Sequence, residues 1–353
     1  GKPGVRVNIS AVLRKTPKKL LDILLGEAGW EAAEAAADVR SRIYFTWDAP
    51  GFLARLGHPS SKGVSRDGEA VAQLPPDAWI NQVPGMGHLC DKVNMCLALR
   101  LLQKLWPEKF RFWPKSWLLP AETEQLKAWL RKKGEPVIVK PADGSLGEGI
   151  FIAHSEMDLD AKLLARPSWG MNFCALAQKY VPQPLLVGGL KFDLRLYALL
   201  VWTDDGERCT HRTYLCHEGL ARFCTAKYEA PTTANANQHY MHLTNYSLNK
   251  KSAGFVRAGD PLDPSSSASK RTLTTLLAQI EAQEAAEGRL FDQKKLFAAC
   301  EEVVAVLIQS VAPVLGVTYS RVAKECSAKP AKQAKPQARA AAARKAMDSS
   351  DEE

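Results

Sequence analysis

The sequence predicts an α/β (α+β) fold of several lobes, and three stretches carry that prediction. Residues 5–47 pass from a short apolar strand through a helical run to a second strand candidate. Residues 137–152 read as a strand, a glycine-rich turn and another strand, and residues 191–200 alternate polar with apolar side chains as a half-buried strand does. With 46% apolar and 24% charged residues over 353 positions, the chain can build a large core.

Composition also narrows the class of protein. No run of 18 apolar residues occurs, and the opening GKPGVRVNIS lacks an apolar signal-peptide core, so we expect a cytoplasmic protein without a membrane partner. Eight cysteines are scattered without a C-x-x-C pair. This pattern argues against a zinc ribbon or a disulfide framework and predicts reduced, mostly buried thiols.

The charge is concentrated near the C-terminal end. The net charge is +9, and residues 321–347 hold eight Lys or Arg against one Glu before an acidic DSSDEE. Rich in Ala, Lys, Pro and Gln, residues 321–353 lack the apolar side chains that offset the cost of ordering, so we expect a disordered tail. A basic chain attracts polyanions, but no nucleic-acid recognition motif accompanies the charge, and we expect no nucleic-acid partner.

The N-terminal elements predict a small α/β lobe. Strand candidates cover Val5–Ile9 and Arg42–Trp47, with a helix over Pro17–Ala28, and a polar, glycine-containing loop follows at 60–70. A stretch rich in Pro and Gly at 75–87 suggests a lobe boundary.

A helix is predicted over Asp91–Trp106, closed by Pro107. Its apolar residues recur at helical spacing, which predicts one stripe buried in the core. The stripe consists of Val93, Leu97, Leu101, Leu102 and Leu105.

The first segment with visible chemistry is VIVKPADGSLGEGIFIA, residues 137–153. Three glycines in the turn let the backbone approach an anion closely, and Lys140 at the end of the first strand can place an ammonium group against a phosphate. This is neither a Walker loop nor a Rossmann turn, because no Lys-Ser/Thr follows the last glycine and no helix begins there. By itself, a tight turn without a ligand is the commoner case.

Three further segments carry polar groups. In KFDLRLYALL, residues Lys191, Asp193, Arg195 and Tyr197 share one face of a predicted strand; a ligand site and a mutually paired charge row fit the spacing equally well. Arg222 lies between apolar neighbours on another predicted strand. Polar residues fill a turn at 244–247, where such residues commonly cap the backbone.

Taken in order, these segments resemble the tubulin tyrosine ligase-like family, in particular its polyglutamylase branch. The resemblance spans roughly residues 5–320 and rests on seven blocks in register. They are VPGMGHLCDK (83–92), FRFWPKSWLLPAE (110–122), IVKPADGSLGEGIFI (138–152), QKYVPQPLLVGGLKFDLRLY (178–197), EGLARF (218–223), HLTNYSLNK (242–250) and SKRTL (269–273).

The resemblance implies an ATP-grasp fold with an N-terminal lobe at 1–80, a central lobe at 81–190 and a C-terminal lobe at 191–320, before the tail at 321–353. It implies a ligase that uses ATP and Mg²⁺ to join free L-glutamate to glutamate side chains of tubulin tails through an acyl phosphate. Tubulin or microtubules would be the partner, in the cytoplasm and cytoskeleton and by analogy in the cilium or basal body.

The family's site residues can be carried over only where this sequence matches. For ATP the positions are Lys140, Leu146, Gly147, Gln178, Lys179, Tyr180, Val181, Lys191, Phe192, Asp193, Thr244 and Asn245. For free glutamate they are Arg222, Tyr246, Ser247 and Lys270, whose cations and hydroxyls suit two carboxylates. For catalysis they are Arg195, Arg222 and His242, although a histidine bonded within a turn fits position 242 as well.

This sequence departs from the family pattern at two places. Leu146 stands where the family usually has Gln or Arg facing the acceptor. The strand pair that carries an Asp and a Glu-x-Asn for magnesium is missing after the helix at about 292–312, and Glu301 and Glu302 on that helix point about 100° apart. No metal ligand is therefore assigned, and a catalytically inactive or truncated homologue that binds nucleotide or tubulin is the alternative.

Overall fold

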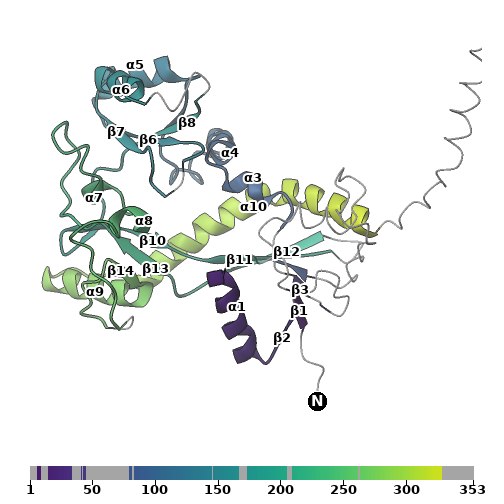
Figure 1. The fold of residues 1–353 in the computed structure, drawn as a ribbon. Coiled ribbons are helices and arrows are strands. Elements are labelled where there is room, and N and C mark those ends of the chain that lie inside the picture. The colour runs from purple at the N-terminus through teal and green to yellow at the C-terminus, as the bar shows by residue number, and fades with distance from the viewer. Residues whose placement is uncertain are drawn as a thin grey trace, which may run out of the picture. The chain divides into compact units, whose positions relative to one another are not determined.

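The computed structural model describes residues 6–8, 15–33, 41, 43–44, 79–81, 83–144, 146–166, 173–204, 209–260 and 263–327 (Figure 1). The chain divides into two compact units, Gly1–Pro84 with Gly316–Glu353, and Gly85–Leu315. The three lobe limits expected from the sequence remain a prediction.

The first unit contains a small parallel sheet. Its strand order is β2 (Glu31–Ala33), β1 (Arg6–Asn8), β3 (Ile43–Tyr44) and β4 (Trp79–Ile80), and each neighbouring pair is parallel. The helix α1 spans Lys15–Ala28. Val7 and Leu25 are buried against Leu21 and Ile43, which joins the helix to the sheet. The predicted strand, helix and second strand are confirmed here, whereas residues 45–47 and the loop at 60–70 lie outside the described residues.

The second unit begins with an antiparallel sheet in the order β5, β8, β6, β7. The strands are β5 (Ser116–Leu119), β8 (Ala175–Lys179), β6 (Val137–Pro141) and β7 (Phe151–Ala153). Helices α5 (Thr123–Lys133) and α6 (Glu156–Leu164) lie on one face (Figure 1). Alternate strand residues such as Val137, Val139 and Phe151 pack there against Leu126 and Leu159 of the helices. The opposite face is therefore left for the residues between them, including Lys140 and Gln178.

A second antiparallel sheet follows in the order β14, β13, β10, β9. The strands are β14 (Lys270–Thr272), β13 (Leu220–Phe223), β10 (Leu190–Arg195) and β9 (Leu186–Val187). Its apolar face packs on α9 (Leu273–Ala286) through residues such as Phe223, Leu276 and Ile280. The predicted alternation of β10 is confirmed, because Phe192 and Leu194 belong to this core while Lys191 and Asp193 lie on the other face.

The single strand expected across 191–200 is interrupted, and this prediction was wrong. β10 ends at Arg195, and β11 (Ala198–Asp204) pairs with β12 (Cys209–Leu215) in a separate two-stranded sheet. Close backbone packing accompanies the break: a Cβ added to Gly219 would lie 2.7 Å from the carbonyl oxygen of Arg195. Only glycine fits there without displacement.

The predicted helix at 91–106 is present, but its buried stripe was predicted wrongly. Helix α4 spans Lys92–Leu105 after the short α3 (Met86–Cys90), and the Asp91 carboxylate accepts hydrogen bonds from two amides of the first turn. Cys96 and Leu99 are the buried residues. Leu97, Leu101 and Leu105 are 52–59% exposed. The side of the helix that packs on the sheet is the one that carries Cys96 and Leu99, not the one with the most regular apolar spacing.

The last helix, α10, spans Gln293–Ser327 and contains Pro313. It is longer than the helix expected at about 292–312 and extends into the region expected to be disordered; residues 328–353 lie outside the described residues. Its portion Gln293–Ser320 is the one described helix long and apolar enough to cross a membrane by length and composition. Core helices of soluble proteins can meet the same criterion, so the length and composition of this helix give only weak support for a membrane span.

The described cysteine side chains form no disulfide. Cys96 and Cys224 are buried, but Cys90, Cys174 and Cys216 are exposed. The expectation of mostly buried thiols was therefore wrong for this part of the chain.

Candidate functional site

The glycine-rich hairpin between β6 and β7 is held from two sides. The Lys92 ammonium group donates to the carbonyl oxygens of Ala142, at 3.0 Å, and Gly144. On the other side, the Ser247 hydroxyl donates to the carbonyl oxygen of Leu146 at 2.9 Å. Gly147 has φ +93°, and a Cβ there would lie 3.1 Å from Cγ of Asn245. The hairpin predicted from sequence is thus fitted closely to the segment around Asn245.

Lys140 points away from the helix-covered face of the first sheet. Its ammonium group donates to Oε1 of Gln178 at 2.7 Å, and the Gln178 amide donates to the Ser116 hydroxyl at 3.1 Å. Burial, helped by the charges of Lys191 and Lys92, lowers the pKa of Lys140 to about 8. A partly desolvated cation beside two others is a favourable setting for a phosphate.

Lys191 belongs to a buried hydrogen-bond chain. Its ammonium group donates to the Tyr180 hydroxyl and to the carbonyl oxygen of His242, both at 2.9 Å. The Tyr180 hydroxyl lies 3.2 Å from Nδ1 of His242, whose Nε2 lies 3.2 Å from the carbonyl oxygen of Asn235. A neutral ring with its proton on Nε2 satisfies both contacts. Burial lowers the pKa of His242, in keeping with that form.

Asp193 and Arg222 form an ion pair on the same face of the second sheet. They are opposite each other in the β10–β13 register, and Nε and Nη2 of Arg222 donate to the two carboxylate oxygens at 2.8 and 2.7 Å. The Thr244 hydroxyl donates to Asp193 at 2.6 Å. The bond to Asp193 raises the pKa of Arg222. Asp193 therefore orients Arg222 and balances its charge.

An aromatic and basic group adjoins this pair. Lys270 lies opposite Arg222 in the β13–β14 register, and its ammonium group is 5.4 Å from the ring centre of Tyr246. The Lys250 ammonium group is 5.9 Å from the same ring. Arg222, Lys270 and Tyr246 are thus brought together, and two cations beside a hydroxyl could bind a small dicarboxylate.

Some predicted site residues occupy other surroundings. The side chain of Phe192 packs in the core of the second sheet, and Lys179 forms a 2.9 Å ion pair with Glu135. His242 is only 2% exposed, and both its ring nitrogens are in contact with protein groups. His242 ends the short helix His239–His242 and contacts Tyr180 from another part of the chain, so it is not bonded only within a turn. A direct catalytic role stays a prediction.

The remaining predicted positions differ in exposure. Leu146 has φ 60° and a side chain that is 64% exposed, and Val181 is 59% exposed. Arg195 is also exposed. Gln178, by contrast, is 6% exposed and contacts Lys140 directly.

Sequence reasoning missed several residues that organise the site. Lys92 and Ser116 lie in the resembling blocks at 83–92 and 110–122, but no local pattern indicates that they reach the hairpin or Gln178. Asn235 occurs in a turn, where asparagine is ordinary, and Asn249 ends the short helix Tyr246–Asn249. Their contacts connect residues distant in the sequence, so spacing alone carries no signal for them.

Magnesium does not fit the described residues in a way that would assign its ligands. Among them, no three His, Cys, Asp or Glu side chains gather closely enough to hold a metal ion. Glu302 is exposed and lies 3.6 Å from Lys109, so the helix glutamates act as surface charges. The described residues therefore assign no metal position.

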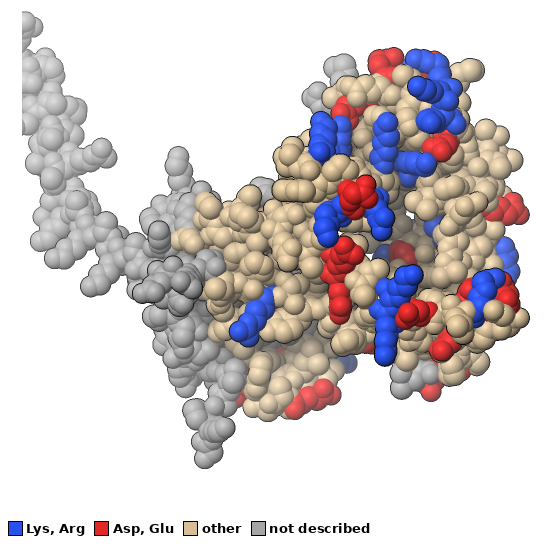
Figure 2. All heavy atoms as spheres, turned by 180° about the vertical axis from the view of Figure 1, so that it is seen from behind, with Lys and Arg blue, Asp and Glu red and all other residues tan. Residues whose placement is uncertain are grey.

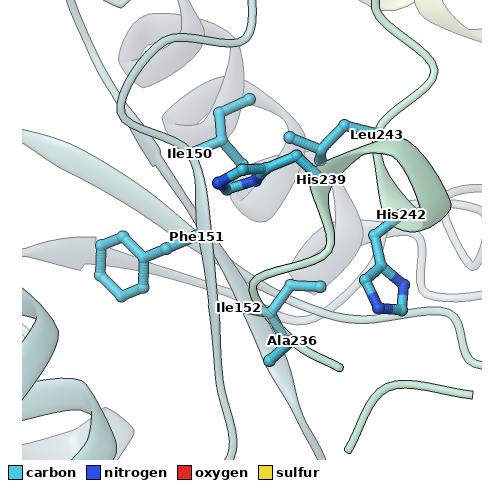
Figure 3. Close-up of a pocket in the computed structure, with 7 residues that line it drawn as sticks. All are labelled: Ile150, Phe151, Ile152, Ala236, His239, His242 and Leu243. Carbon is cyan, nitrogen blue, oxygen red and sulfur yellow. The ribbon is translucent and has the colours of Figure 1, made fainter. Parts of the chain in front are cut away.

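A small hollow between β7 and α7 (His239–His242) lies beside this network (Figure 3). Its lining residues are Ile150, Phe151, Ile152, Ala236, His239, His242 and Leu243. Neither Lys140 nor Lys191 lines it. Its lining combines five apolar residues with two histidines and includes no Lys or Arg to meet a triphosphate.

Surface charge adds little to the site assignment. On the face drawn in Figure 2, Lys and Arg are interspersed with Asp and Glu over the described residues. This face shows no patch of a single charge that would favour binding a polyanion. The site assignment therefore rests on the cations around Lys140 and Arg222.

Comparison with known proteins decides the family. The tubulin-tyrosine ligase family matches residues 71–313, more than half of the chain. This chain belongs to the tubulin-tyrosine ligase family. The matched residues include the hairpin, both four-stranded antiparallel sheets and the segment at 242–250. The family match therefore covers all the site residues described above.

The most similar relatives include polyglutamylases. Mouse tubulin polyglutamylase TTLL11 is 36% identical over 249 residues, which are 68% of this chain and 31% of the relative. Human tubulin polyglutamylase TTLL6 is 32% identical over 252 residues, 71% of this chain and 25% of the relative. This chain thus spans about a third or less of the length of these proteins.

Solved structures give only a distant likeness. D-alanyl-alanine synthetase A from Vibrio cholerae aligns with a TM-score of 0.38 and 11% identity, covering 89% of this chain and 82% of that one. The RimK domain protein ATP-grasp from Sphaerobacter thermophilus gives a TM-score of 0.32 at 15% identity, covering 54% and 69%.

Proposed function

We propose that this chain is an ATP-grasp ligase that adds glutamate to glutamate side chains in the C-terminal tails of tubulin. Family membership supports the reaction class, and the names of the relatives support the acceptor. Under this proposal the chain acts in the cytoplasm on microtubules, including those of cilia and basal bodies.

The observation that carries the proposal is the convergence of cations on the hairpin side of the first sheet. Lys140 and Lys191 are both partly buried, and burial lowers the pKa of each. Two lysines desolvated together, with their charges opposing each other, are stabilised when an anion neutralises them. The polyphosphate of ATP supplies that anion, and the hairpin that Lys92 and Ser247 hold in place covers it.

The reaction proceeds in two steps. An acceptor carboxylate oxygen attacks the γ-phosphorus of ATP, and the bond to the β,γ-bridging oxygen breaks, which gives an acyl phosphate and ADP. The glutamate amine then attacks the acyl carbon, inorganic phosphate leaves, and the amine loses a proton. Lys140 and Lys191 offset charge on the transferring oxygens, while Arg222, Lys270 and Tyr246 bind the carboxylates of free glutamate.

Bound magnesium would screen the triphosphate in this chemistry. Because the described residues offer no metal cluster, no step is assigned to it. The same finding favours the second candidate function, a homologue that binds nucleotide or tubulin without turnover.

Incorporation of labelled glutamate into microtubules tests the proposal. The purified chain is supplied with ATP and magnesium beside Lys140→Ala, with Lys132→Ala on the exposed end of α5 as the matched control. Incorporation that is lost in Lys140→Ala and kept in Lys132→Ala supports a ligase. ATP binding or microtubule binding without incorporation supports the non-catalytic homologue, and the absence of incorporation and of both kinds of binding contradicts the two functions alike.

A further inference from the structure

Asn249 connects the parts of the site without being available to a ligand. It is the last residue of α8 (Tyr246–Asn249) and is 1% exposed. Its amide nitrogen donates to the carbonyl oxygens of Leu243, at 2.6 Å, and Asn245, at 3.1 Å. Its amide oxygen accepts from the backbone N–H and the hydroxyl of Thr225, both at 3.1 Å.

These four bonds use the whole capacity of the carboxamide. Asparagine offers two N–H donors and two acceptor positions on oxygen, and each has a protein partner here. The partners also define the orientation of the amide, since the two carbonyl groups require donors and the Thr225 N–H requires an acceptor. No polar atom of Asn249 is left to contact substrate.

The two segments that Asn249 joins both carry site groups. Thr225 follows β13 closely, the strand of Arg222. Segment 243–247 contains Thr244, which donates to Asp193, and Ser247, which donates to the hairpin at Leu146. A shift of this segment would therefore loosen both the Asp193–Arg222 pair and the hairpin.

We propose that Asn249 is a positioning residue that fixes segment 243–247 against the hairpin, so that the nucleotide side and the glutamate side of the site keep one relative geometry. The inference deepens the proposed ligase function and rests on it for its effect on catalysis. The mechanical part, fixation of the segment, does not depend on any ligand.

Asn249→Asp tests the inference with nearly unchanged shape. A carboxylate still accepts from Thr225 but cannot donate to the two carbonyl groups. The Leu243 carbonyl then loses its side-chain donor, the Asn245 carbonyl keeps only its backbone donors, and both face negative charge. We expect hydrogen exchange in peptides covering 243–249 and 142–150 to rise about tenfold, with ATP affinity lower by a similar factor. Asn94→Asp, an exposed position on α4, is the control with the same charge change.

Steady-state kinetics separate positioning from a general loss of stability. We expect Asn249→Asp to raise the KM for ATP more than it lowers kcat, whereas partial unfolding would reduce kcat in proportion to the folded fraction. If Asn249→Asp does not fold, Thr225→Val carries the test, because it removes only the hydroxyl bond and keeps the backbone one. A smaller increase in exchange over the same peptides is then expected.

The inference would be overturned if hydrogen exchange in both peptides of Asn249→Asp equals that of the wild type. If Asn249→Asp does not fold, unchanged exchange in Thr225→Val would overturn it. A wild-type chain that binds no ATP would instead overturn the proposed function, while the exchange comparison would still show whether Asn249 fixes the segment. The two failures are therefore distinguishable.

Discussion

Asp193 and Arg222 face each other across β10 and β13, joined by two hydrogen bonds of 2.8 and 2.7 Å. The pair is half-buried, so it is neither a screened surface contact nor a sealed ion pair. One carboxylate fixes the plane of the guanidinium group and leaves Nη1 without a bond to Asp193. This arrangement orients Arg222 toward a further carboxylate, the role that we propose for it with glutamate.

Arg222→Lys tests that orientation. Lysine keeps the charge but cannot reproduce the planar, two-point contact, so we expect kcat/KM for glutamate to fall by roughly tenfold to hundredfold. Arg212→Lys on the exposed face of β12 makes the same substitution away from the site. Equal activity of Arg222→Lys and the wild type would contradict a role for the fork geometry.

The pKa of Lys140, about 8, predicts a pH dependence of ATP binding. Below that pKa the free protein already carries the cation. Above it the lysine must take up a proton when the phosphate binds, so affinity for ATP falls as pH rises from 8. Calorimetric titrations between pH 7 and about 9.5 measure the fall and the proton uptake.

Lys140→Arg is the control for this pH effect, because arginine stays protonated throughout that range. We expect its ATP affinity to change little between the two ends of the pH series. A fall as steep as that of the wild type would assign the titration to another group.

Gly147→Ala and Gly134→Ala form a matched pair of variants. Both glycines have positive φ, +93° and +62°, but only the Cβ at 147 meets a neighbour, Asn245 at 3.1 Å. Placing alanine in this positive-φ backbone conformation costs about 1 kcal/mol in each case. We expect both variants to lose about that much in the free energy of unfolding, and only Gly147→Ala to lose ATP affinity as well.

Denaturant unfolding and nucleotide binding, measured on both glycine variants, check this expectation. Equal ATP affinity of the two variants would mean that the hairpin adapts without disturbing the Asn245 contact.

Tyr180→Phe removes the hydroxyl that lies between Lys191 and Nδ1 of His242. Two buried groups lose a partner, so we expect the free energy of unfolding to fall by about 1–3 kcal/mol. Tyr228→Phe, whose hydroxyl donates to the exposed carbonyl oxygen of Pro182, is expected to cost less. Urea unfolding measures both, and an equal cost would show that the buried chain adds no stability.

Local sequence patterns predicted the helices and strands best where one short segment contains all the residues that define the structure. The strand, turn and strand at 137–152 contain their own turn glycines and apolar runs, and they appear as β6, the hairpin turn and β7. The alternation of Lys191 and Asp193 with Phe192 predicted the two faces of β10, because side chains of a strand alternate whatever lies on either side.

Local patterns failed where a partner decides the outcome. The regular apolar row of α4 predicted the wrong buried side, because helical spacing identifies a stripe but not the surface that covers it. The break after Arg195 is accompanied by the close approach of Gly219, which directly precedes β13 and lies far from Arg195 in the sequence. Neither fact is encoded in the neighbouring residues alone.

The sequence by itself therefore determined the family, the two-faced strands and most of the cationic groups, since residue type and order carry that information. The tertiary structure decided their surroundings: it pairs Lys140 with Gln178 and Asp193 with Arg222, and it buries His242. Hydrogen bonds and burial depend on distances between residues far apart in the chain, and these distances exist only once the two four-stranded sheets of the second unit have formed and packed.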